Sequence, residues 1–182
     1  MMVLLFIGCH SVFNELPVLS YKINDEGKKI NYLITYHDFT NQLGEPFTTK
    51  NIKNKVFIAN FFFTRCPSIC PPMRTELIKI ANTFKEENDF MIISHTIEPD
   101  NDSVKVLNDY GTATDVASSL WQFVRSSEKN TRNQANDYMT NFKSNEDGSD
   151  FYHSSFVALI DKKQQIRGFY NILVSEEVNR LK

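Results

Sequence analysis

Two cysteines that lie four positions apart are the residues of this chain with the clearest chemical potential. Cys66 and Cys70 bound the segment C-P-S-I-C, between an apolar run and the start of a helical pattern. Two close thiols at such a junction can exchange electrons as a dithiol/disulfide couple, or they can bind a soft metal ion. A purely structural role is the third interpretation. It is disfavoured because inert core cysteines rarely lie between prolines such as Pro67 and Pro71 at a strand-to-helix junction.

The helix expected after the cysteine segment bears on the acidity of its thiols. Backbone N–H groups in the first turn of a helix have no partner within the helix, and the helix dipole favours negative charge there. A thiolate at this position is stabilised, which lowers the pKa of the thiol. Arg65 adds a positive charge beside Cys66, and we expect it to act in the same direction. More thiolate near neutral pH favours nucleophilic attack and metal ligation alike.

A metal site at the two cysteines needs a third ligand, and the histidines are the first residues to consider. His10 lies in the N-terminal extension, and His37 follows an apolar strand, where a surface position is common. His95 alternates within a buried run, which is typical of a hydrogen-bonded core histidine. His153 stands directly before another apolar run, at the start of a strand that would face the cysteine segment. The pattern alone leaves a functional and a structural role for His153 equally open.

The N-terminal segment carries the third cysteine. Residues 1–8 are apolar and the run stops at Cys9, which is too short to span a bilayer, since that takes about 20 apolar residues. Phe6–Cys9 resembles a bacterial lipoprotein signal, in which the cysteine is lipidated and becomes the first mature residue. No basic residue precedes the run, so a fortuitous apolar leader is the alternative. We expect residues 1–17 to be a leader and tether, with a lipid anchor at Cys9 and an extracytoplasmic, membrane-anchored location at the periplasmic face.

The composition indicates one packed domain after this tether. Hydrophobic residues make up 41% of the 182 positions and aromatic residues 13%, which favours a globular core over disorder. The formal net charge is −2, and no basic block indicates a nucleic acid or an acidic membrane surface as the partner. We therefore expect a single domain over residues 18–182 and no nucleic-acid partner.

Apolar periodicity predicts alternating strands and helices along this domain. Strands are expected where apolar residues alternate or run continuously, and helices where they recur every three to four positions. The expected strands cover 18–23, 30–36, 56–63, 90–97, 121–124, 154–160 and 165–170. The expected helices cover 71–87, 103–110, 127–142 and 175–182. Residues 41–54 are polar, and we expect a loop with little regular structure there, whereas we expect residues 143–150 to be a polar turn region.

The order of these elements predicts the fold. The run at 56–63 is apolar on both faces, which suits a central strand covered by helices on each side. Alternating strands and helices that end in a hairpin and a helix are the order of a thioredoxin-like domain. The sequence thus predicts an α/β, thioredoxin-like three-layer fold with a central mixed sheet flanked by helices. In such a fold the carboxyl end of a central strand forms the active edge, and Cys66 and Cys70 fall there.

Three separate blocks of the chain resemble the Sco/SenC family. Residues 61–71, which read F-F-F-T-R-C-P-S-I-C-P, resemble its cysteine signature, and Glu98–Asp102 resembles its Asp-Pro-x-x-Asp loop. Residues 153–161 resemble its His-Ser strand, and residues 167–170 resemble the hairpin that follows. The similarity runs from about His37 to the C-terminus, and the order of the three blocks makes it specific.

The resemblance implies a function as well as a fold. Members of this family are membrane-tethered, thioredoxin-like copper proteins that help to assemble the binuclear copper centre of cytochrome c oxidase, and some are thought to act as thiol-disulfide reductants. It implies Cys66, Cys70 and His153 as ligands of copper, as Cu(I) or Cu(II), and the two cysteines as a redox pair. Thiolates favour Cu(I) and an added imidazole also allows Cu(II), although zinc accepts the same ligands.

Three positions depart from the family pattern. Ser68 stands where the family often has Asp, Tyr152 stands where Asp often precedes the histidine, and Glu98 replaces the first aspartate of the loop. None of the three is a ligand implied by the resemblance. They bear instead on how the residues around the ligands tune the metal.

We therefore expect a copper metallochaperone whose partner is the copper-centre subunit of cytochrome c oxidase or another copper or thiol partner. The alternative is an extracytoplasmic thiol-disulfide oxidoreductase, thioredoxin- or peroxiredoxin-like, which needs both cysteines but not His153. A thioredoxin-like binding module with a vestigial site is a third possibility, and the intact spacing of the three ligands argues against it.

Overall fold

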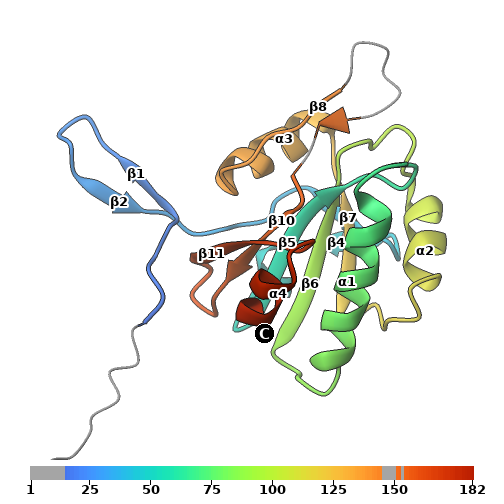
Figure 1. Cartoon of the computed structure of the whole chain (residues 1–182). Helices are drawn as coiled ribbons and strands as arrows, with labels where there is room; N and C mark the ends of the chain where they lie inside the picture. Colours follow the sequence, from blue (N-terminus) through green and yellow to red (C-terminus); the bar gives the residue numbers. More distant parts are fainter. Residues whose placement is uncertain (1–14, 145–150, 153) are drawn as a thin grey trace, which may run out of the picture.

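A mixed β-sheet forms the centre of the molecule (Figure 1). The computed structural model describes residues 15–144, 151–152 and 154–182, and in these ranges seven strands form this sheet in the order β11-β10-β5-β6-β7-β3-β4. The central strands β5 (Val56–Phe62), β6 (Phe90–Thr96) and β7 (Trp121–Arg125) are parallel to one another. The outer strands are antiparallel to their neighbours: β10 (Phe156–Ile160), β11 (Ile166–Asn171), β3 (Phe39–Asn41) and β4 (Pro46–Phe47).

Helices cover both faces of this sheet. Within the described ranges they are α1 (Cys70–Thr83), α2 (Val104–Thr112), α3 (Glu128–Asp137) and α4 (Ser175–Leu181). Asn60 and Phe62 of β5 line a small cavity with residues of α1 and α2, whereas Ala59 and Phe61 line a cavity beside the end of α3. Since successive strand residues point to opposite faces, α1 and α2 lie on one face and α3 on the other (Figure 1). The predicted α/β, thioredoxin-like three-layer fold with a central mixed sheet is confirmed.

The strand and helix positions follow largely from apolar patterning and side-chain caps. β6 is buried along its whole length, and β5 is buried from Phe57 onward, as expected for strands covered on both faces. The side chains of Ser103 and Ser127 accept hydrogen bonds from the backbone N–H of Val106 and Asn130, at 3.3 and 3.2 Å, and so begin α2 and α3. Both predicted helix starts are confirmed.

Several predicted boundaries were wrong. Residues 41–54 contain the end of the β3–β4 hairpin and a 3-10 helix, Thr49–Ile52, instead of an irregular loop. Asn41 builds that hairpin turn, because its side-chain oxygen accepts from the backbone N–H groups of Leu43 and Glu45. The helices predicted over 71–87 and 127–142 end early, at Thr83 and Asp137.

The remaining strands are short pairs outside the main sheet. β1 (Tyr21–Ile23) and β2 (Lys29–Asn31) form the hairpin that projects from the body in Figure 1, and both are shorter than the strands predicted there. β8 (Lys143–Ser144) pairs with β9 (Phe151–Tyr152), so the first two residues of the segment 143–150, predicted to be a polar turn region, form one strand of a two-stranded pair. The rest of that segment, residues 145–150, lies outside the described residues.

His95 is a satisfied core histidine, as its alternation within β6 predicted. It is fully buried, with Nδ1 3.0 Å from the backbone oxygen of Asn60 and Nε2 2.9 Å from the hydroxyl of Tyr36. Burial lowers the pKa of His95 to about 4, so the ring is neutral. A carbonyl oxygen only accepts, so Nδ1 carries the proton and Nε2 accepts from Tyr36. The hydroxyl of Tyr138 then donates to Tyr36, over 2.7 Å.

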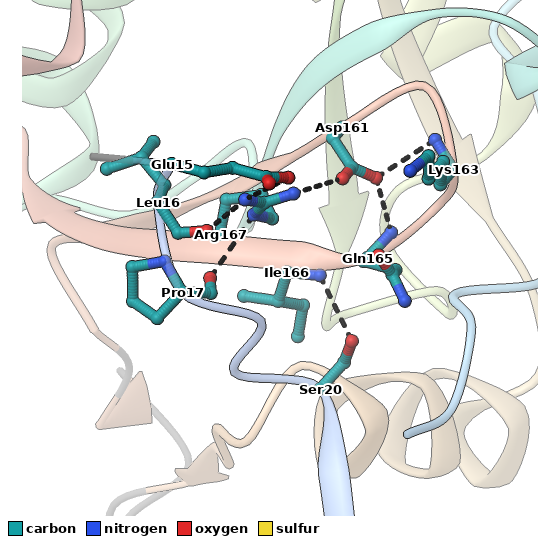
Figure 2. A network of polar contacts seen from close by, with 9 residues as sticks. All are labelled: Glu15, Leu16, Pro17, Ser20, Asp161, Lys163, Gln165, Ile166 and Arg167. Carbon is teal, nitrogen blue, oxygen red and sulfur yellow. Dashed lines mark hydrogen bonds and ion pairs between the residues drawn. The ribbon is translucent and has the colours of Figure 1, made fainter. Parts of the chain in front are cut away.

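The described end of the N-terminal segment is fixed to the sheet by one arginine. The guanidinium of Arg167 on β11 donates to the backbone oxygens of Leu16 and Pro17 and forms ion pairs with Glu15 and Asp161 (Figure 2). Arg167 is only 9% exposed, so these contacts satisfy a buried charge. The predicted division into residues 1–17 and 18–182 stays a prediction, and Cys9 and His10 lie outside the described residues.

The buried imidazole predicts a pH-dependent stability. The pKa of His95 falls from 6.5 to about 4 on folding, so the unfolded state binds more protons between these values. The free energy of unfolding should therefore fall as the pH drops below about 6.5, by up to ~3 kcal/mol near pH 4. Urea unfolding from pH 7 to pH 4, compared between the wild type and His95→Gln, measures this contribution. Equal slopes of stability against pH in the two proteins would contradict it.

Candidate metal and redox site

The cysteine segment connects the carboxyl end of β5 to the first turn of α1, where the sequence predicted it. After β5 the chain makes a turn in which the backbone N–H of Cys66 lies 3.3 Å from the oxygen of Phe63. α1 then begins at Cys70, and Pro71 and Pro72 occupy its first positions. Proline fits there because the first N–H groups of a helix have no intrahelical partner. The segment is thus fixed on one side by the central strand and on the other by the helix.

Cys66 and Cys70 form a buried pair of thiols. They are 6% and 4% exposed and are not joined in a disulfide. The thiol of Cys66 is hydrogen-bonded to that of Cys70, and its sulfur lies 3.6 Å from the hydroxyl oxygen of Ser68. Two thiols in contact can be oxidised to a disulfide without a large movement, or they can bind one soft ion together. The geometry is compatible with both interpretations of the sequence.

The loop around Cys66 favours its thiolate. Burial raises the pKa of the Cys66 thiol, but hydrogen bonds from the backbone and side chains of Cys70 and Ser68 lower it by more, so the pKa lies below its ordinary value. The backbone N–H of Cys70 belongs to the first turn of α1, where such groups have no partner within the helix. The prediction that the helix start stabilises the thiolate is confirmed.

Arg65, whose charge was expected to act on the thiol, is paired with Glu98. Its guanidinium forms a two-pronged ion pair with Glu98, in which Nε lies 2.7 Å from one carboxylate oxygen and Nη2 contacts the other. The charge of Glu98 offsets that of Arg65, and the lowered pKa of Cys66 comes from hydrogen bonds instead. The Glu98 side chain is 7% exposed, and Arg65 covers it from the solvent side. The glutamate that departs from the family pattern therefore has a defined partner beside the cysteine segment.

Asp102 is a part of this region whose role the sequence analysis missed. It is fully buried, and its carboxylate accepts hydrogen bonds from the hydroxyls of Thr64 and Thr96, each over 2.5 Å, and from the backbone N–H of Thr64 over 3.2 Å. Burial raises the pKa of Asp102, and the hydrogen bonds oppose this rise. The sequence signal that could have indicated a role for Asp102 was its position after the carboxyl end of β6. The carboxyl ends of neighbouring parallel strands meet at one edge of a sheet, so the residues that follow them lie close together.

The position of the expected third ligand, His153, stays a prediction because this residue lies outside the described residues. Ala158 of β10 pairs with Ala59 of β5 in antiparallel register, so β10 begins where β5 ends. Phe151 also lies at this edge, and its ring centroid is 5.1 Å from that of Phe63. Across the described ranges, no three or more His, Cys, Asp or Glu side chains are grouped so that they could hold a metal ion.

Fold and site together define a thioredoxin-like protein with a reduced cysteine pair at a strand-to-helix junction. The chain belongs to the SCO1/SenC family, whose sequence profile matches residues 26–179. A curated relative, the SCO1 protein homolog of Bacillus subtilis (strain 168), is 33% identical over 96 residues, which are 52% of this chain and 50% of the relative. This match therefore spans about half the length of the relative. The resemblance proposed from the three sequence blocks is confirmed at the level of the family.

Solved structures agree with this assignment. A SCO1/SenC family lipoprotein from Bacillus anthracis str. Ames is 26% identical, with a TM-score of 0.75 over 90% of this chain and 92% of its own. BsSco, in which a disulfide switch was identified, is a member of the Sco family of cytochrome c oxidase assembly proteins. It is 26% identical, with a TM-score of 0.69 over 87% and 88% of the two chains. Yeast Sco1 with copper bound is 25% identical, with a TM-score of 0.64 over 81% and 84%.

The membrane anchor at Cys9 stays a prediction. Cys9 lies outside the described residues, and the word lipoprotein is used of the B. anthracis relative and not of this chain. In the part of the chain that the structure covers, no helix has both the length and the apolar character needed to cross a membrane.

The hydrogen bond from Ser68 predicts a measurable change in thiol reactivity. In Ser68→Ala the thiolate of Cys66 loses one donor, so the pKa of this thiol should rise and its alkylation at pH 7 should slow by roughly two- to tenfold. Iodoacetamide labelling followed by mass spectrometry, from pH 5 to pH 10, measures the rate at Cys66. Ser126→Ala is the matched control, because that hydroxyl donates to the backbone oxygen of Asp38. A Ser68→Ala profile that overlies the wild type would rule out this role.

Proposed function

We propose that this protein binds copper at Cys66, Cys70 and His153 and delivers it during the assembly of the copper centre of cytochrome c oxidase. The observation that carries the proposal is the reduced, buried cysteine pair at the active edge of a chain that belongs to the SCO1/SenC family. Copper is the cargo in this function. The protein has to bind it, protect it from solvent and release it to a partner.

The chemistry of the two thiols supports copper as the cargo. Cu(I) is a soft ion that prefers thiolate ligands, and hydrogen bonds already favour the thiolate of Cys66. A metal ligand must be deprotonated, so a lowered thiol pKa also reduces the cost of binding near neutral pH. The copper-bound structure of yeast Sco1, a relative at 25% identity, supports the same ion.

The arrangement of the sheet supports His153 as the third ligand. The described ranges provide no third His, Cys, Asp or Glu to the cysteine pair, which leaves this place open for His153. Phe151, two positions before His153, packs against Phe63 beside the cysteine segment, and β10 starts shortly after it at the same edge. A three-ligand site leaves room for a partner's ligand, which permits stepwise transfer of the ion.

Thiol-disulfide exchange is the second candidate function for the same residues. The contact between the two thiols and the lowered pKa of Cys66 favour it. Oxidation would join the two sulfurs, release two protons and pass two electrons to a partner disulfide, which becomes a dithiol. The disulfide switch identified in BsSco, at 26% identity, supports such a reaction. Because the disulfide consumes both thiolate ligands, the oxidised protein would be the form that cannot hold copper.

We also propose that the protein works outside the cytoplasm and is tethered to the membrane through Cys9. The support is the apolar segment that ends at Cys9 and the lipoprotein description of the B. anthracis relative. The folded domain would then be held through residues 15–17, which Arg167 fixes against β11. The copper-centre subunit of cytochrome c oxidase is the proposed partner.

Copper titration of ligand variants tests the metal site. We expect Cys66→Ala and Cys70→Ala to lose at least about 100-fold in Cu(I) affinity, because removal of a ligand should cost no less than the 10–100-fold known for residues behind the ligands. His153→Ala should weaken Cu(I) binding and abolish the thiolate-to-Cu(II) absorption band. Competition with a coloured Cu(I) chelator and visible absorption spectra provide the measurements. His37→Ala is the matched control, since His37 is an exposed histidine of a loop.

The same variants separate the two candidate functions. A copper chaperone requires all three residues, whereas a disulfide oxidoreductase requires only the cysteines. If His153→Ala retains the copper affinity and spectrum of the wild type, the three-ligand site is wrong. Turnover of a disulfide substrate by His153→Ala at the wild-type rate, without copper binding by any form, would establish the oxidoreductase instead.

A further inference from the structure

A buried carboxylate joins the cysteine loop to the neighbouring loop of the sheet. Asp102 lies in the segment between β6 and α2, directly before the capping residue Ser103, and it is 0% exposed. Its side chain reaches Thr64, which lies on the cysteine loop two residues before Cys66. The two residues are 38 positions apart in the chain, so this contact exists only in the folded protein.

The carboxylate of Asp102 accepts from both hydrogen-bond donors of Thr64. One carboxylate oxygen accepts from the Thr64 hydroxyl over 2.5 Å, and the other accepts from the Thr64 backbone N–H over 3.2 Å. Together they hold the backbone and side chain of Thr64 in one orientation. Thr64 is the second residue of the turn in which the N–H of Cys66 bonds to the oxygen of Phe63. The direction of the Cys66 side chain therefore depends on Thr64.

Asp102 is itself held in place from the opposite side. Arg125 of β7 donates from Nε to the backbone oxygen of Asp102, over 3.1 Å, and from Nη2 to that of Pro99, over 2.9 Å. The hydroxyl of Thr96, at the end of β6, donates to the Asp102 carboxylate over 2.5 Å. These contacts fix Asp102 to the sheet independently of the cysteine loop. Asp102 is therefore a rigid support for Thr64.

We propose that Asp102 is a positioning residue that, through Thr64, aims the Cys66 thiol at Cys70 and Ser68 and so favours the dithiol form of the pair over the disulfide. The hydrogen bonds to the Cys66 sulfur from Cys70 and Ser68 stabilise the reduced pair. A disulfide sulfur carries no negative charge, so it gains less from these hydrogen bonds than a thiolate does. Loss of the support should weaken the reduced form more than the oxidised one. This inference rests on the cysteine pair of the proposed function but not on copper.

The structure provides a matched pair of substitutions to test the proposal. Thr64→Val and Thr96→Val each remove one hydroxyl that donates to the same carboxylate over the same 2.5 Å, but only Thr64 belongs to the cysteine loop. Each full-length variant is equilibrated with mixtures of reduced and oxidised glutathione. The reaction converts one protein dithiol and one glutathione disulfide into one protein disulfide and two glutathione thiols. Mass spectrometry after acid quenching and alkylation gives the equilibrium constant.

We expect Thr64→Val to shift this constant toward the protein disulfide by at least about threefold, the ratio that corresponds to roughly half of one hydrogen bond. Thr96→Val should shift it by less, and Thr64→Ser, which keeps the hydroxyl, should restore the wild-type value. Equal shifts in Thr64→Val and Thr96→Val, or no shift in Thr64→Val, would overturn the proposal. Thermal unfolding checks that all variants fold.

A second variant keeps the test decisive if Thr64→Val does not fold. Asp102→Asn retains the side-chain volume but replaces one acceptor oxygen by an NH₂ group, which cannot accept from Thr64 or Thr96. We expect the same direction of shift in the equilibrium constant, and an unchanged constant in this folded variant would overturn the proposal. Failure of the wild type to bind Cu(I) would instead contradict the proposed function and leave the thiol equilibrium as a separate result.

Discussion

Burial of β5 and β6 on both faces is the constraint on which the rest of the molecule depends. A polar group inside such a strand pair has no access to water, so each one needs a partner within the protein. His95 forms hydrogen bonds with the backbone oxygen of Asn60 and the hydroxyl of Tyr36. The hydroxyl of Ser94 donates to the side chain of Asn60 and accepts from the indole N–H of Trp121. These bonds tie the central strands together and to β7. The two strands consequently end at one edge in a fixed relation, and the cysteine loop starts from that edge.

The same constraint explains why one ion pair and one hydrogen-bonded carboxylate lie where the strands end. Thr64 and Arg65 leave β5 as Glu98 and Asp102 leave β6, and each residue of one loop meets a partner on the other. Asp102 and Glu98 are both buried carboxylates, which are costly unless charged or hydrogen-bonding groups satisfy them. The ion pair and hydrogen bonds that satisfy these buried carboxylates therefore also join the two loops.

The central strands and two helix starts could be predicted from the sequence, but these contacts between loops could not. Continuous apolar runs located β5 and β6, and Ser103 and Ser127 located two helix starts, because each signal is local. The hairpin built by Asn41 was missed, since its polar composition is also that of a loop. Arg65 was assigned to the thiol because proximity along the chain is visible in the sequence. Its true partner, Glu98, is 33 positions away and becomes apparent only when parallel strands are placed side by side.

Ser68 shows how one departure from the family pattern changes the chemistry of the pair. A carboxylate beside Cys66, where the family often has Asp, would place a like charge near the thiolate and raise the pKa of the thiol. The neutral hydroxyl of Ser68 instead participates in a hydrogen bond with the sulfur, which lowers this pKa. Cys66 therefore does not need Arg65 for its activation, and Arg65 can remain paired with Glu98. The two loop interactions are separate: the hydrogen bonds lower the pKa of the Cys66 thiol, and the ion pair joins the loops.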